Sequence, residues 1–187
     1  MKNIFITIGH DCSSRSSLEA IKLFNGSHPF DDKICDEESI LLTLKDDFKD
    51  FLNINYFFFK NDEFFRPVNK YGIVLDHLYG FDLHNNISKI DIYNKTNIEI
   101  INNDNTNTIY NKSRVLNSNW LEKHNKIVVP KIERRIKRFR ESFKDNNKVF
   151  LWRYSNLSKN NCIKINNILN DRYKNFNLII IIIHWYD

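Results

Sequence analysis

The sequence predicts a layered α/β domain with a largely parallel central sheet, flanking helices and a β-rich excursion. First, the apolar runs at residues 3–8 and 178–183 have the composition of strands buried on both faces, as parallel strands are. Second, segments with helical spacing alternate with these strands. Third, a polar, strand-rich stretch at about 84–117 interrupts the pattern. We expect the 187 residues to form a single domain.

A first helix is predicted over about 14–25, directly after the first strand. Ser16 and Glu19 have the spacing of a capping box, and Gly26 is a residue type at which helices end. A second helix is predicted over about 37–52, because its first turn is acidic and its apolar residues recur on one face. That face consists of Ile40, Leu44, Phe48 and Phe51.

The middle of the chain is predicted to be rich in strands. Aromatic and apolar runs predict strands at 56–59 and 71–79, the second of which contains His77. Within the excursion, three short strands are predicted, at 87–93, 97–101 and 106–110. The tract Asn102-Asn103-Asp104-Asn105 has the composition of a hairpin turn between the last two strands.

The last third returns to alternating helices and strands. A helix is predicted to begin at Pro130, a favoured first-turn residue, and to continue to about 144. Its apolar side comprises Ile132, Ile136, Phe139 and Phe143. The basic residues Arg134, Arg135, Lys137, Arg138 and Arg140 lie on its other sides. The remaining elements are a strand at 148–153, a helix at 159–173 and a fully buried strand at 178–183.

Composition and charge narrow the function classes. The net charge of +5 is compatible with an anionic partner but does not require one. Three cysteines without a CxxC pair predict neither a zinc site nor a disulfide framework, so no metal or cofactor is expected. The longest apolar run, Leu178 to Ile183, is too short to span a bilayer. We therefore expect a soluble cytoplasmic protein in a reducing compartment, without a membrane partner.

The segment Gly9-His10-Asp11-Cys12-Ser13-Ser14 lies where the first strand meets the first helix. A thiol at the start of a helix is close to unpaired main-chain N–H groups and to the positive end of the helix dipole, which favour the thiolate. We therefore predict that Cys12 is a nucleophile. The alternative is a small buried hydrophobic side chain, since free cysteines are among the most buried residues.

A cysteine nucleophile requires a histidine base and a group that orients the imidazole. Among the six histidines, His77 is preferred, because two parallel strands would bring it to the same sheet edge as Cys12. His184, which follows the last strand, is the reserve base. Asp31 and Asp91 are both candidates for the orienting carboxylate.

Four segments follow one another between residue 3 and about residue 155. They are Gly9-x-x-Cys12 after a strand, Pro29-Phe30-Asp31 after a helix, Asp47-Phe48-x-x-Phe51 followed by His77, and Arg134-Arg135-Ile136-x-Arg138-Phe139 followed by a strand ending at Arg153. In their order and spacing, the chain resembles a family of papain-like cysteine peptidases found in bacteria and large DNA viruses. The resemblance implies a thiol hydrolase with Cys12 as nucleophile and His77 as base, and a papain-like α+β fold as the alternative architecture.

The predicted reaction is hydrolysis of an amide in a peptide or acyl substrate, through a thioester on Cys12. Main-chain N–H groups near Cys12 and Ser13 are expected to hold the oxyanion. Ser13, Ser14, His10 and Arg153 are expected to contact the substrate. Ester hydrolysis and acyl transfer would use the same groups.

A second function class is nucleic-acid or phosphate binding through Arg134 and Arg138 on the basic helix 130–144. An ordinary solvated amphipathic face explains the same charges, so nucleic acid is the less favoured partner. A third class is a non-catalytic module that binds another protein.

Overall fold

The computed structural model describes residues 1–60, 66–75, 78, 99–103, 106–110, 122 and 124–183. The predicted strand at 87–93 lies outside these ranges, as do His77, Asp91 and His184. Contacts divide the chain into two compact units. The first comprises Met1–Lys49 and Ile132–Asp187, and the second comprises Asp50–Lys131, which contains the predicted excursion.

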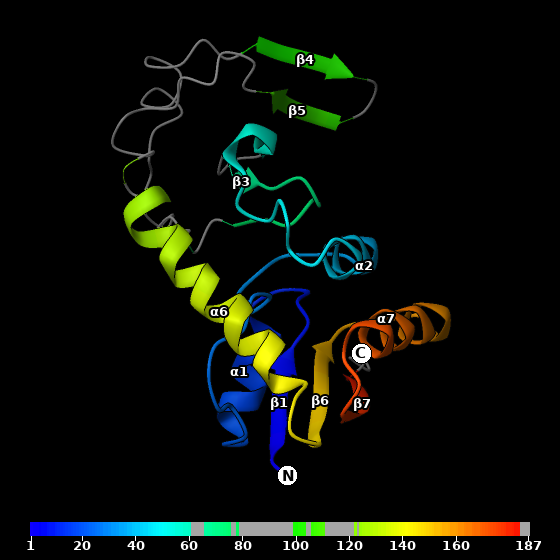
Figure 1. The fold of residues 1–187 in the computed structure, drawn as a ribbon. Helices are drawn as coiled ribbons and strands as arrows, with labels where there is room; N and C mark the ends of the chain where they lie inside the picture. The colour runs from blue at the N-terminus through cyan, green and yellow to red at the C-terminus, as the bar shows by residue number, and fades with distance from the viewer. Residues whose placement is uncertain are drawn as a thin grey trace. The chain divides into compact units, whose positions relative to one another are not determined.

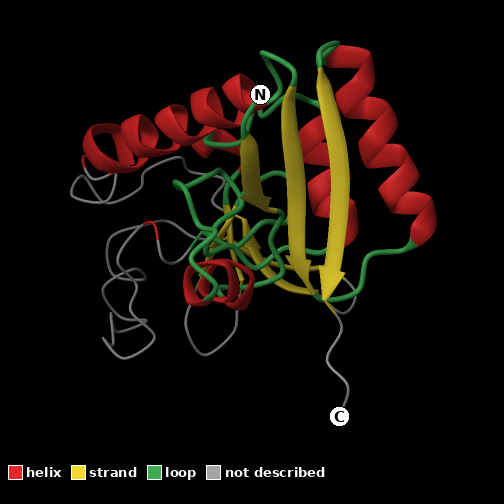
Figure 2. Ribbon diagram, turned by 90° about the horizontal axis from the view of Figure 1, so that it is seen from below, coloured by secondary structure: helices red, strands yellow, loops and turns green. Residues whose placement is uncertain are grey.

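The first unit is built on a parallel sheet, which has three strands among the described residues in the order β1-β6-β7 (Figure 1). These strands are β1 (Asn3–Thr7), β6 (Asn147–Tyr154) and β7 (Phe176–Ile183). Helices are connected to the strands of this sheet and are drawn in red in Figure 2. They are α1 (Ser13–Ala20), α2 (Glu37–Lys45), α6 (Val129–Ser142) and α7 (Lys159–Arg172). This arrangement confirms the predicted α/β class with a parallel sheet.

The central strand β6 supplies the middle of the core. Val149 and Leu151 are fully buried, while Phe150 points to the other face and stacks on Phe5 of β1 at 4.6 Å between ring centroids. β7 was expected to be fully buried, but it is an outer strand of the described sheet, and Ile179 is 36% exposed. An apolar run alone does not distinguish an outer strand from a central one, because both have one face on the core.

Helix α1 differs from its prediction at both ends. It begins at Ser13, so Ser16 lies inside the helix and not at its N-cap, and the expected capping box is absent. Glu19 accepts a hydrogen bond from the Arg15 side chain. It ends at Ala20, well before Gly26, because Lys22 adopts a positive φ of 59°. The helix is therefore shorter than the apolar spacing indicated.

Helix α2 begins as predicted. The Asp36 carboxylate accepts a hydrogen bond from the Ser39 N–H at 2.7 Å, which caps the acidic first turn. The helix ends at Lys45 rather than near residue 52, because Asp47 and Phe48 both have positive φ. The predicted apolar positions are nevertheless buried, and these are Ile40, Leu44, Phe48 and Phe51.

Helix α6 follows a π-helical turn at His124–Val128, so the helical segment begins before the predicted start at Pro130. All four residues of its predicted apolar side are buried. The Phe139 ring packs edge-on against Phe30 and Phe48, and Phe143 stacks on Tyr173. Within the described ranges, no helix has both the length and the apolarity needed to cross a membrane.

The second unit contains an antiparallel sheet in the order β3-β2-β5-β4. Its strands are β2 (Phe58–Lys60), β3 (Arg66–Val68), β4 (Glu99–Asn103) and β5 (Thr106–Tyr110). β4 pairs antiparallel with β5, and Asn103 lies opposite Thr106, so the two predicted strands are neighbours. Asn102 and Asn103, which were expected in the turn, are residues of β4, and residues 104–105 lie outside the described ranges. In the described part of segment 71–79, a single bridge between Val68 and Val74 replaces the predicted strand.

Candidate functional site

The loop between β1 and α1 presents Cys12 at the surface. Gly9 and His10 have φ values of 73° and 93°, which turn the chain sharply out of the strand. The Asp11 carboxylate accepts a hydrogen bond from the Ser13 N–H at 2.7 Å and so caps the helix. Cys12 occupies the N-cap position, its side chain makes no capping bond, and it is exposed. The thiol is therefore not the buried side chain that the alternative interpretation required.

The buried side chain of Cys35 packs against this loop at Gly9. A Cβ added to Gly9 would lie 1.9 Å from the Sγ of Cys35, so only glycine fits there. The Cys35 N–H also donates to the His10 carbonyl at 3.3 Å. Burial raises the pKa of the Cys35 thiol, so this sulfur is held in its neutral form. Cys35 was not a candidate at the level of sequence, since no spacing links it to Gly9.

Arg153 braces the same loop. It is 2% exposed, and its guanidinium donates to the carbonyls of Ile8 at 2.8 Å, Asn156 at 3.0 Å and Cys35 at 3.3 Å. These bonds join the end of β1 to the segment before α2. Arg153 was expected to contact substrate, but its donors are directed at the chain's own backbone, which gives it a supporting position.

Of the other residues that were expected to contact substrate, Ser13 and Ser14 hold the loop in place and His10 lies at the surface. The buried Ser14 hydroxyl donates to the Gly9 carbonyl at 2.7 Å and accepts from the Tyr154 N–H at 3.1 Å, so it ties α1 to the sheet. The Ser13 N–H is occupied by Asp11. The His10 side chain is 44% exposed, and its Nε2 lies 3.8 Å from the Asp11 carboxylate. Of these residues, only His10 presents a titratable ring beside the thiol's loop.

Asp31 lies in the interior of the first unit. Its carboxylate accepts hydrogen bonds from the Thr7 hydroxyl and from the His28 N–H, the latter at 2.8 Å. Burial raises the pKa of Asp31, against the opposing effects of these donors and of Arg135. These partners hold the loop after α1 against β1. Nothing in the described residues directs the carboxylate at an imidazole.

Three basic residues of α6 bind the chain itself. Arg135 is buried and its guanidinium reaches the Asp31 carbonyl at 3.5 Å. Arg138 donates to the Ser27 carbonyl, and Arg140 forms an ion pair with Asp47 at 3.0 Å. Arg134 is exposed, as a residue of a solvated face would be. The intramolecular contacts therefore explain most of the charge that suggested nucleic-acid binding.

The site can be assembled only partly from the described residues. They supply the thiol and its supporting loop, whereas His77, Asp91 and the reserve base His184 lie outside them and stay predictions. No group of three or more metal-ligating side chains lies together within the described ranges. Comparisons with protein-family models, curated proteins and solved structures gave no match.

Proposed function

We propose that the protein is a papain-like thiol hydrolase with Cys12 as its nucleophile. The observation that carries this proposal is an exposed thiol at the start of α1, directly after a parallel strand and without a capping bond of its own. First-turn amides of a helix lack intrahelical acceptors, so those beyond Ser13 are suited to hold an oxyanion. The positive φ of His10, in a loop held by Arg153, fits the strained backbone common at functional sites.

In the proposed reaction, His77 takes the thiol proton and the Cys12 sulfur attacks the acyl carbon of an amide. The C–N bond then breaks, and the same proton passes to the departing amine, which leaves a thioester on Cys12. Water adds to the thioester, assisted by the histidine, and releases the carboxylic acid and the free thiol. Asp91 is the preferred orienting group, because the Asp31 carboxylate is already bonded to Thr7 and His28.

The substrate class follows from the same chemistry. A peptide amide is the first choice, and ester hydrolysis or acyl transfer would proceed through the same thioester. None of the three cysteines forms a disulfide, and a thiolate nucleophile needs reducing conditions, so we propose a cytoplasmic location.

The proposal is tested by the rate at which iodoacetamide alkylates each cysteine, measured by mass spectrometry of the folded and the urea-unfolded chain. At neutral pH, Cys12 should react at least about tenfold faster in the folded protein than in the unfolded chain, as an activated nucleophile would. Buried Cys35 should be protected, which checks that the fold is intact. Equal alkylation rates for Cys12 in the folded and unfolded chain would reject the proposal that Cys12 is a nucleophile.

Turnover is tested separately with a library of fluorogenic peptides and aryl esters. Cys12→Ser and His77→Ala should each abolish hydrolysis of any substrate found. Cys162→Ser serves as the matched control, because Cys162 is a free cysteine on α7 and not on the β1–α1 loop, and this variant should retain full activity.

A further inference from the structure

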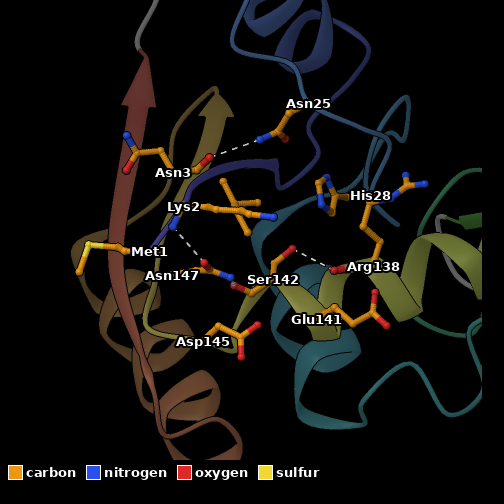
Figure 3. A pocket seen from close by; sticks show the side chains of 11 residues that line it. Met1, Lys2, Asn3, Asn25, His28, Arg138, Glu141, Ser142, Asp145 and Asn147 are labelled. Carbon is orange, nitrogen blue, oxygen red and sulfur yellow. Dashed lines mark hydrogen bonds between the residues drawn. The ribbon is translucent and has the colours of Figure 1, made fainter.

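The first unit has a cavity of about 370 Å³ that is separate from the Cys12 loop. It is formed by the start of β1, the loop after α1, the end of α6 and the turn before β6, and Figure 3 shows its lining. None of the residues 9–14 contributes to it. Its volume falls within the range of small-molecule pockets, roughly 300–1,000 Å³.

One wall of the cavity contains a histidine whose hydrogen-bonding capacity is unused. His28 is 1% exposed, and neither ring nitrogen has a hydrogen-bond partner among the described residues. Buried polar groups are nearly always paired, so an unpaired imidazole beside a cavity indicates a partner that binds there. Both ring nitrogens are shielded from solvent, so a ligand that bonds to one of them must displace the atoms that cover it.

The imidazole is neutral at physiological pH. Burial, followed by the charges of Arg138 and Arg135, lowers the pKa of His28 to about 3. The Gly26 backbone opposes this shift. A neutral ring carries one N–H donor, which suits an anionic oxygen.

Most other polar groups of the cavity are already bonded to one another. Asn25 donates to the Asn3 carbonyl at 3.4 Å, and Asn147 accepts from the Lys2 N–H at 3.1 Å. Ser142 donates to the Arg138 carbonyl at 2.9 Å. The side chains of Asn25, Asn147 and Ser142 are therefore committed. The charged side chains and the imidazole are the groups best suited to meet a ligand.

The charged side chains are separated by sign. In Figure 3, Lys2 and Arg138 lie with His28 in the upper part of the view, and Glu141 and Asp145 lie below them. Neither Lys2 nor Arg138 forms an ion pair with a carboxylate of the described residues. Arg138 donates one hydrogen bond to the Ser27 carbonyl, which leaves its charge without a carboxylate partner. Two positive charges beside a neutral N–H donor match a dianion, and the carboxylates below can accept hydrogen bonds from hydroxyl groups.

We propose that this cavity binds a small phosphorylated polyol. Its phosphate lies against Lys2, Arg138 and the His28 N–H, and its hydroxyl groups face Glu141 and Asp145. A phosphate dianion carries the charge that two cations require, whereas a carboxylate would neutralise only one of them. This site is independent of the Cys12 chemistry.

The test is isothermal titration of the full chain with glycerol 3-phosphate, inorganic phosphate and glycerol. Glycerol 3-phosphate should bind most tightly, inorganic phosphate more weakly, and glycerol without measurable heat. Lys2→Gln and His28→Phe should each weaken binding of glycerol 3-phosphate by about tenfold or more, the effect of losing one charge-assisted or buried hydrogen bond. Lys164→Gln, an exposed lysine on α7, is the matched control and should bind as the wild type does.

Lys2 is exposed, so Lys2→Gln decides the outcome even where His28→Phe does not fold. Absence of glycerol 3-phosphate binding to the wild-type chain would overturn the proposal. Wild-type affinity in Lys2→Gln would overturn it as well. Equal affinities for glycerol 3-phosphate and inorganic phosphate would overturn the assignment of the carboxylates to hydroxyl groups. An NMR shift of the His28 ring nitrogens on addition of ligand would support it directly.

Discussion

The guanidinium of Arg153 is a buried cation whose partners are main-chain carbonyls on three separate segments. Such a residue cannot be recognised from sequence, because an arginine at the end of a strand is equally suited to bind a substrate. The structure shows why Arg153 supports the loop and does not face a substrate. The carbonyls of Ile8, Cys35 and Asn156 converge on one point in the interior, and a side chain with several donors satisfies all of them.

Arg153→Met should therefore destabilise the protein and also loosen the Cys12 loop. Removing the guanidinium leaves buried carbonyls unpaired, which costs about 1–3 kcal/mol for each group. We expect the urea midpoint to fall accordingly and the alkylation rate of Cys12 to approach that of the unfolded chain. Arg134→Met, at an exposed position of α6, should change stability by less than about 0.5 kcal/mol. A wild-type midpoint for Arg153→Met would contradict the bracing role.

Gly9 is constrained by both its backbone and its neighbour. Its φ of 73° disfavours any side chain, and an added Cβ would collide with Cys35 Sγ. Gly9→Ala should cost more than the roughly 1–2 kcal/mol of a left-handed alanine, because the clash adds to it. In a Cys35→Ala background the clash is relieved, so the cost should fall toward that value. A double-mutant cycle in urea measures this coupling, and additive costs would exclude the contact.

At the scale of elements, the start of α2 was predictable and its end was not. Asp36 has the residue type and position of an N-cap, and the structure forms that cap. The end depends on positive φ at Asp47 and Phe48, where the tertiary packing of Phe48 against Phe30 and Phe139 overrides helical spacing. Local signals at a helix start lie within one turn, whereas signals for its end came from residues far along the chain.

Asp36→Ala should lower the stability of the first unit by about 1 kcal/mol, since the Ser39 N–H loses its acceptor. Urea denaturation followed by far-UV circular dichroism measures the change. Glu38→Ala is the matched control, because Glu38 is an exposed carboxylate in the same first turn that does not cap the helix. Equal losses in both variants would attribute the effect to helix-dipole charge and not to the cap.

At the scale of the whole molecule, the class of fold was predictable because it rests on repeated signals. The runs containing Ile6 and Leu151 gave the parallel strands, and the spacing of Ile132 and Phe139 gave the helix beside them. The edge position of β7 was not predictable, since strand order depends on how distant segments pair. Of the candidate site residues, Cys12 is exposed at the turn between β1 and α1, while Asp31 is bonded to Thr7 and His28 by contacts that no spacing reveals.

The stability of the molecule should fall in mild acid because of His28. Its pKa is about 3 in the folded chain and 6.5 ordinarily, so the unfolded chain binds the extra proton between these values. The stabilisation is fully present above pH 6.5 and is lost as pH falls toward 3. Burial and the charges of Arg138 and Arg135 cause the shift, while the raised pKa of Asp31 acts in the opposite direction.

The free energy of unfolding should be measured in urea for the wild type and for His28→Phe, at neutral pH and two pH units below 6.5. Between these pH values, the wild type should lose on the order of 2 kcal/mol more of this free energy than His28→Phe. Phenylalanine fills a similar volume and cannot titrate. The loss of stability of His28→Phe in acid therefore reports the remaining groups, Asp31 among them. The lowered pKa of His124 is common to both proteins and cancels in the difference. If the free energy of unfolding falls by the same amount in both proteins, the His28 imidazole acquires a proton in the folded chain. That outcome requires a partner for His28 in the unliganded cavity.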